Sequence, residues 1–153
     1  MPPSPSGAFP HQHDDPRGLV ERIEAQLRER IAEAADMAGL KLMVDLRQRQ
    51  GRPAPETSSD VDRREFEQIV SNLLTHLRDA FSGELAAEQR VEFERAEAAQ
   101  PKPADKLLAG QVFLARQLPD YWQRFEAHVA EYEKARLDAP GSASGWLSKL
   151  FGR

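Results

Sequence analysis

The sequence predicts an all-α fold, a bundle of four to five helices. Apolar residues recur at steps of three and four over several long stretches, and no stretch alternates apolar and polar residues as a strand would. Segments containing proline and glycine separate these stretches. A second arrangement fits the same pattern: a long hairpin of the first two helices, followed by a C-terminal helix pair. Such a hairpin would leave more apolar surface exposed.

Length and composition limit the chain to one modest domain. It has 153 residues, of which 40% are hydrophobic and 30% charged, with a formal net charge of -4. An excess of Lys and Arg would be needed to bind nucleic acid, so we expect no nucleic-acid partner. Cysteine is absent, which excludes disulfides and thiolate metal sites. Residues 1–15, rich in Pro, Ser and His, predict a disordered leader without a signal peptide, and hence a cytoplasmic protein.

The first helix is expected to begin at Pro16, which suits the first helical position, with Asp15 as its N-cap. Near Gly39 its apolar stripe becomes less regular, which predicts either a kink or a change of buried face. The helical pattern ends by Gly51. The predicted stripe consists of Val20, Ile23, Leu27, Ile31, Ala34 and Ala38.

The second helix has the strongest amphipathic pattern in the chain. A linker precedes it, and Ser59 or Asp60 is the predicted N-cap. Gly83 predicts a break after the helix. Its apolar face consists of Phe66, Ile69, Val70, Leu73, Leu77, Ala80 and Phe81. Residues 84–99 then extend this helix or form a short third one, with a thin stripe of Leu85, Val91 and Ala96 and with Phe93 to one side.

Two further helices complete a helical domain that we expect over residues 16–139. The first begins at Pro103 or Asp105 and ends before Pro119, which can occupy the first turn of the next helix. Its apolar residues are Leu107, Leu108, Val112, Phe113 and Leu114. The last helix carries Trp122, Phe125, Val129 and Tyr132 on one face.

Two pairs of His and carboxylate residues are the candidates for metal chemistry. His76 precedes Asp79, and His128 precedes Glu131, each by three residues, so each pair shares a helix face. If the two helices face each other, these side chains could bind a metal ion. Because charged residues are so frequent, chance also explains the spacing. Phosphate-binding and dinucleotide-binding motifs are absent, so we expect no cofactor and a protein that is not an enzyme.

The C-terminal residues carry the clearest functional pattern: a flexible spacer at 140–145 and an amphipathic tail at 146–153. Drawn as a helix, the tail has its four large apolar residues within an arc of about 140°. Lys149 and Arg153 lie at the edge of this arc, as in helices that lie on a membrane surface. The four apolar residues are Trp146, Leu147, Leu150 and Phe151.

The segment GWLSKLFG, residues 145–152, resembles the C-terminal membrane-targeting sequence of the MinD family of division-site ATPases. The resemblance implies that the four apolar side chains insert into a membrane and that Lys149 meets anionic lipid. It concerns the anchor alone, because an ATPase of that family needs a phosphate-binding loop that this chain lacks.

These observations predict a non-enzymatic helical adaptor or scaffold that binds itself or a partner protein and attaches by its tail to the cytoplasmic face of the membrane. Because one short tail binds weakly, we expect a homo-oligomer. In an alternative hypothesis the tail docks into a groove on a partner protein, and in another it packs on its own bundle. A metal-binding enzyme that uses the His and carboxylate pairs is a third hypothesis.

Overall fold

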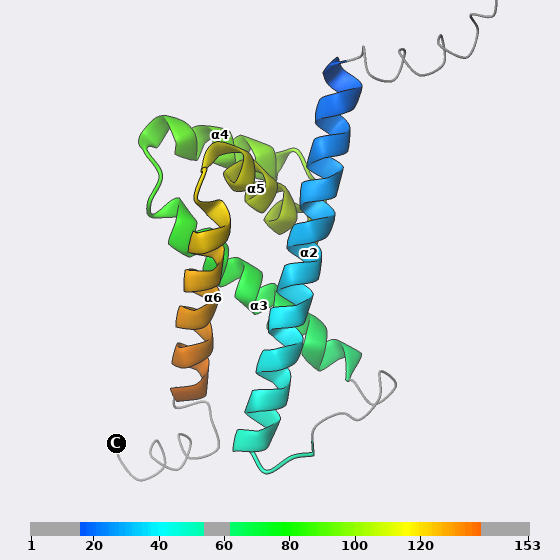
Figure 1. The fold of residues 1–153 in the computed structure, drawn as a ribbon, viewed down its shortest axis with the longest axis vertical. Helices are drawn as coiled ribbons and strands as arrows, with labels where there is room; N and C mark the ends of the chain where they lie inside the picture. Colours follow the sequence, from blue (N-terminus) through cyan, green and yellow to red (C-terminus); the bar gives the residue numbers. More distant parts are fainter. Residues whose placement is uncertain (1–15, 54–61, 139–153) are drawn as a thin grey trace, which may run out of the picture.

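A computed structural model of the chain describes residues 16–53 and 62–138, and these two ranges form an all-α bundle (Figure 1). The helices in the described ranges are α2 (Pro16–Arg49), α3 (Arg63–Ser82), α4 (Ala87–Ala98), α5 (Pro103–Gln117) and α6 (Tyr121–Asp138). No strand occurs in either range. The predicted fold class is therefore confirmed. The predicted leader at 1–15, the spacer at 140–145 and the tail at 146–153 lie outside the described residues.

The bundle is compact rather than an extended hairpin. Helix α2 packs on α3, and α5 and α6 each pack against both of these helices. Helix α4 packs mainly on α5. The core lies where the helices meet and includes Ile31 of α2, Phe81 of α3, Leu114 of α5 and Phe125 of α6. None of the helices in the described ranges is long and apolar enough to cross a membrane.

Helix α2 is a single uninterrupted helix of 34 residues, so Gly39 marks no break. Its buried residues recur at steps of three and four over the C-terminal half of the helix and so form one stripe. The buried residues are Ile31, Ala35, Gly39, Leu42, Met43, Leu46 and Arg47. The prediction that the apolar stripe is buried from Val20 onwards is wrong, because Val20 and Ile23 are 37% and 42% exposed. The N-terminal end of α2 extends beyond the other described helices, which leaves these residues uncovered (Figure 1).

Helix α3 begins two or three residues later than predicted. Asp62, rather than Ser59 or Asp60, is its N-cap, and the Asp62 carboxylate accepts a hydrogen bond of 3.1 Å from the backbone N–H of Glu65. An Asp three residues before a Glu is the spacing of a capping box, which the sequence contains at this point. The predicted end of the helix is confirmed, since Gly83 is the C-cap.

Residues 84–99 contain a separate helix, α4, rather than an extension of α3, and their predicted apolar stripe is wrong at Val91, while Leu85 is buried as predicted. Phe93 is fully buried, whereas Val91 is 54% exposed. The reason is the contact with α5, where the Phe93 ring fills the space beside Gly110. A Cβ atom on Gly110 would lie 2.8 Å from the ring, so the missing side chain allows α4 and α5 to approach.

Helices α5 and α6 follow the prediction closely. Pro103 occupies the first turn of α5. Pro119 precedes α6 instead of lying in its first turn, because α6 begins at Tyr121. Tyr121 and Phe125 are buried in the core, and Trp122 is half-buried and packs edge-on against the Tyr121 ring at 5.1 Å between centroids.

Candidate functional site

The tail residues that carry the main sequence prediction lie outside the described residues. Trp146, Leu147, Lys149, Leu150, Phe151 and Arg153 therefore remain a prediction from the sequence. The last described helix before the tail, α6, ends at Asp138.

The predicted His and carboxylate residues come together only in part. Helices α3 and α6 do face each other, and Glu131 lies between the two histidines. One Glu131 carboxylate oxygen is 3.5 Å from His76 Nε2 and 3.7 Å from His128 Nδ1. His128 Nε2 is also 3.4 Å from a carboxylate oxygen of Glu84. Asp79 does not join them, because it forms an ion pair with the adjacent Arg78.

Aromatic side chains fix both histidines. The His76 ring lies 5.0 Å from the ring of Tyr132, and the edge of the His128 ring packs on Phe81 at 4.9 Å. Throughout residues 16–53 and 62–138, no group of three or more His, Asp or Glu side chains is arranged to hold a metal ion. What the geometry supports here is a polar contact between α3 and α6.

Two polar pairs, one buried and one partly buried, join neighbouring helices, and the sequence did not indicate either. The guanidinium of Arg78 donates to Glu97, and this hydrogen bond raises the pKa of Arg78 and joins α3 to α4. The Tyr121 hydroxyl donates to Gln111 Oε1 at 2.7 Å, which joins α6 to α5. Burial raises the pKa of the Tyr121 hydroxyl, so it stays a hydrogen-bond donor over the whole physiological range.

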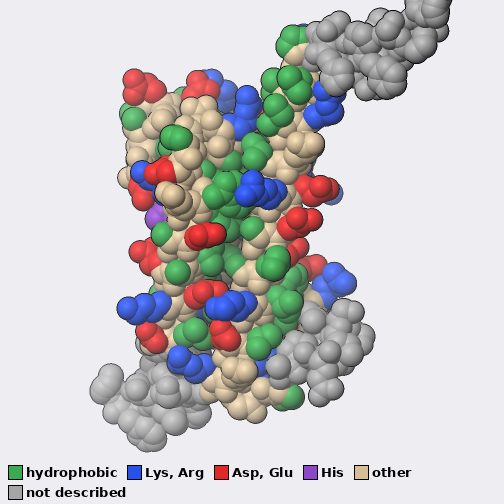
Figure 2. Space-filling view, viewed as in Figure 1, with side chains coloured by type: hydrophobic (Ala, Val, Ile, Leu, Met, Phe, Trp, Pro, Cys, Tyr) green, Lys and Arg blue, Asp and Glu red, His purple; other side chains and the backbone are tan. Residues whose placement is uncertain are grey.

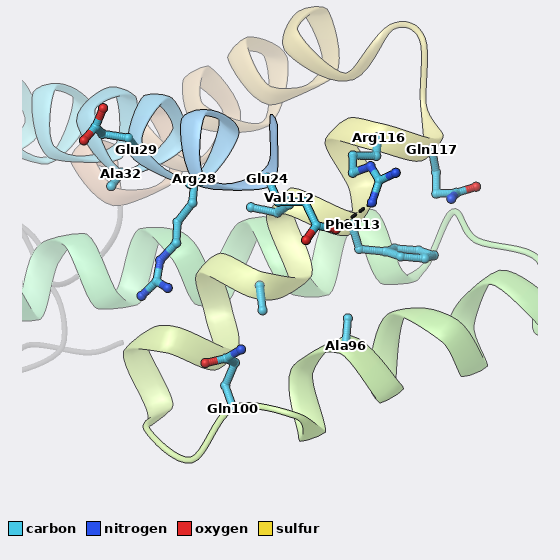
Figure 3. Close-up of a pocket in the computed structure, with 12 residues that line it drawn as sticks. Glu24, Arg28, Glu29, Ala32, Ala96, Gln100, Val112, Phe113, Arg116 and Gln117 are labelled. Atoms are coloured by element: carbon cyan, nitrogen blue, oxygen red, sulfur yellow. Dashed lines mark hydrogen bonds and ion pairs between the residues drawn. The ribbon is translucent and has the colours of Figure 1, made fainter. Parts of the chain in front are cut away.

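A pocket of about 560 Å³ opens between α2, α4 and α5 (Figure 3). Its volume suits a small molecule. Apolar side chains, including Val112, Phe113 and Ala96, line part of it. Arg28 and Arg116 also line it, but Arg28 pairs with Asp105 and Arg116 pairs with Glu24. The arginines are thus engaged by carboxylates of the same chain, and the pocket has no chemistry that selects one class of ligand.

A second hollow, the α2/α6 groove, runs between α2 and α6 and has a volume of about 430 Å³. Figure 2 shows hydrophobic side chains in the hollow between the two helices and charged side chains along its sides. The residues that line the groove are Arg30, Ala34, Met37, Ala38, Trp122, Phe125, Glu126, Val129, Ala130 and Glu133. The Arg30 guanidinium lies 4.2 Å above the centre of the Trp122 ring. The alanines on both walls keep the groove open because their side chains are short.

The same face of α2 continues as an exposed apolar stripe toward the N-terminal end of the helix. Eighteen residues make five helical turns, so Val20 lies directly in line with Ala38, and Leu19 with Met37. Leu19, Val20 and Ile23 are 44%, 37% and 42% exposed. An apolar stripe of this kind is a common feature of surfaces that bind another protein.

Three surfaces of the described residues can therefore contact another molecule: the pocket beside α4, the α2/α6 groove and the exposed stripe of α2. Each is defined by side-chain geometry, and the groove and the stripe share one face of α2. No model of a known protein family, no curated protein and no solved structure matches the chain.

Proposed function

We propose that this protein is a non-enzymatic helical adaptor or scaffold that attaches to an anionic membrane surface through its C-terminal tail. The observation that carries the proposal is the pattern of residues 146–153, four large apolar residues on one helical face with Lys149 and Arg153 at its edge. The helical bundle then acts as the part that binds itself or a partner protein.

The exposed stripe of α2 supports the second half of the proposal. Leu19, Val20 and Ile23 form an apolar surface at the end of α2 that no other described helix covers. Contact with a second copy or a partner would remove this surface from water, which is favourable by about 25 cal/mol for each Å² buried. An oligomer would also present several tails to one membrane, and each further tail would bind at a raised effective concentration.

Sedimentation with lipid vesicles tests the membrane attachment. The full chain is mixed with vesicles containing anionic lipid, in parallel with a truncation that ends at Pro140. The full chain is expected to pellet with the vesicles and the truncation to stay in solution. Equal pelleting of both chains, or no pelleting of either, would refute the proposal.

Two matched variants locate the contact within the tail. Trp146→Ser removes an apolar side chain from the predicted membrane face, whereas Ser148→Ala changes the opposite face. Loss of pelleting with Trp146→Ser and normal pelleting with Ser148→Ala are expected. Vesicles of neutral lipid alone should bind the full chain less, because Lys149 and Arg153 then lose their anionic partners.

A further inference from the structure

We infer that the α2/α6 groove binds the chain's own C-terminal tail, residues 146–153, and that this contact competes with the membrane. The competition with the membrane rests on the proposed function, because it requires that the tail binds lipid. The docking of the tail in the groove does not depend on the proposed function. A tail held in the groove has its apolar face covered, so occupancy of the groove lowers membrane binding without abolishing it.

The groove has the chemistry that an amphipathic helix needs. Its walls include Ala34 and Ala38 on α2 and Ala130 on α6, whose short side chains let a third helix approach closely. Met37, which is 73% exposed, offers a flexible apolar side chain beside them. An amphipathic helix binds such a groove with its apolar side chains at steps of three and four, the spacing of Trp146, Leu147, Leu150 and Phe151.

Charge on the groove matches charge on the tail. Glu126 and Glu133 lie seven residues apart on α6 and thus on one line along the groove. Glu133 contacts Lys41 at 3.6 Å, while Glu126 has no ion-pair partner within residues 16–53 and 62–138. Lys149 and Arg153 are the basic residues of the tail, and they can pair with these carboxylates. The tail is therefore expected to lie with its basic edge toward α6.

The spacer is long enough for the tail to reach the groove of its own chain. Glu133 and Glu126 lie five and twelve residues before the end of α6 at Asp138, which is about 8 and 18 Å along the helix. The seven residues from Ala139 to Gly145 span up to about 25 Å when extended. A tether of this length holds the tail near the groove at roughly millimolar effective concentration. This favours the chain's own tail over an untethered helix.

A spin label beside the groove tests whether the tail lies there. The chain has no cysteine, so Ala127→Cys, an exposed position on α6 that does not line the groove, takes a nitroxide at one place only. The backbone amide signals of Trp146–Phe151 are expected to lose most of their NMR intensity in the full chain. Unchanged tail signals would overturn the inference. Broadening that arises only between chains, in a mixture of spin-labelled and isotope-labelled protein, would also overturn it, because the occupant would then be a second copy.

Charge reversal on the groove tests the competition. Glu126→Lys removes the carboxylate that has no partner, and Glu94→Lys makes the same change of charge at an exposed site on α4. Glu126→Lys is expected to restore the tail signals and to raise pelleting with anionic vesicles about threefold over Glu94→Lys, the size of one surface ion pair. Equal pelleting of the two variants, with tail signals still broadened in both, would overturn the role of Glu126. Broadened tail signals in the full chain, with no pelleting of either the full chain or Glu126→Lys, would refute the membrane function and leave the docking supported.

Discussion

Replacement of Gly39 by Ala tests the closest approach between α2 and α3. Gly39 is buried in α2, and a Cβ atom there would lie 2.6 Å from Cγ2 of Val70 on α3. Carbon atoms in ordinary contact are about 3.5–4.0 Å apart, so one of the two helices or the Val70 side chain must move. Val70 is β-branched and has few rotamers, which limits how far it can turn away.

The free energy of unfolding reflects two opposing effects in this variant. Ala is favoured over Gly in a helix interior by about 1 kcal/mol. Overpacking of a core contact costs about 1–3 kcal/mol. Gly39→Ala is therefore expected to destabilise the protein by up to about 2 kcal/mol. In a Val70→Ala background the clashing methyl group is gone, and the same Gly39→Ala change is expected to stabilise the protein by about 1 kcal/mol.

Urea unfolding of the four chains measures this coupling. The midpoint and slope give the free energy of unfolding of the wild type, each single variant and the double variant. The expected coupling energy between the two sites is about 1–3 kcal/mol. If Gly39→Ala stabilises both backgrounds by the same amount, the two helices do not meet as the structure describes.

Two further predictions concern the core. Phe93→Ala is expected to destabilise the protein by about 3–5 kcal/mol because it leaves a cavity beside Gly110. Val91→Ala, at an exposed position, is expected to change the stability by less than about 0.5 kcal/mol. Thermal unfolding of both variants measures the difference, and equal effects would contradict the burial of Phe93. Burial raises the pKa of Tyr121, so the unfolded chain loses that proton near its ordinary pKa of 10.0 while the folded chain retains it. Stability is then fully present below pH 10 and falls above it, by up to about 1.4 kcal/mol per pH unit from this group. Tyr121→Phe should remove this part of the decline when urea unfolding is measured between pH 9 and 11, and an unchanged decline would contradict the assignment.

The sequence predicted the helices because their signals are local. Pro103 at the start of α5 acts through its own fixed φ and missing N–H group, so its effect does not depend on distant parts of the chain. The face that α4 buries could not be predicted in the same way. Its sequence is mostly charged, and Phe93 is buried in place of Val91 only because Gly110, seventeen residues later, leaves room for a ring.

The candidate surfaces also differ in whether they depend on local sequence or on packing between distant segments. The tail could be predicted from the sequence because its apolar and basic residues already separate on a helix of about two turns. The spacing of His128 and Glu131 predicted that these two residues lie on one face of their helix. The packing of α3 on α6 also brings His76 into contact with Glu131, which the spacing alone could not predict. The α2/α6 groove has no sequence signal of its own. Ala34 and Ala130 meet only after α2 and α6 pack side by side, and alanine is common in helices of every kind.

The energy of one tail is compatible with the inferred competition between the groove and the membrane. Burial of the four large apolar side chains gains about 6–12 kcal/mol, and ordering the eight tail residues costs about 1–2 kcal/mol for each residue. The two totals nearly cancel, so a modest competing contact is sufficient to shift the balance. If the tail occupies the groove ten times as often as it is free, the apparent membrane affinity of that tail falls by about tenfold. A second tail on the same oligomer, held near the membrane by the first, would recover this loss through effective concentration. Membrane attachment is then expected to respond steeply to self-association of the bundle, since one tail must leave its groove before the next is brought to the lipid.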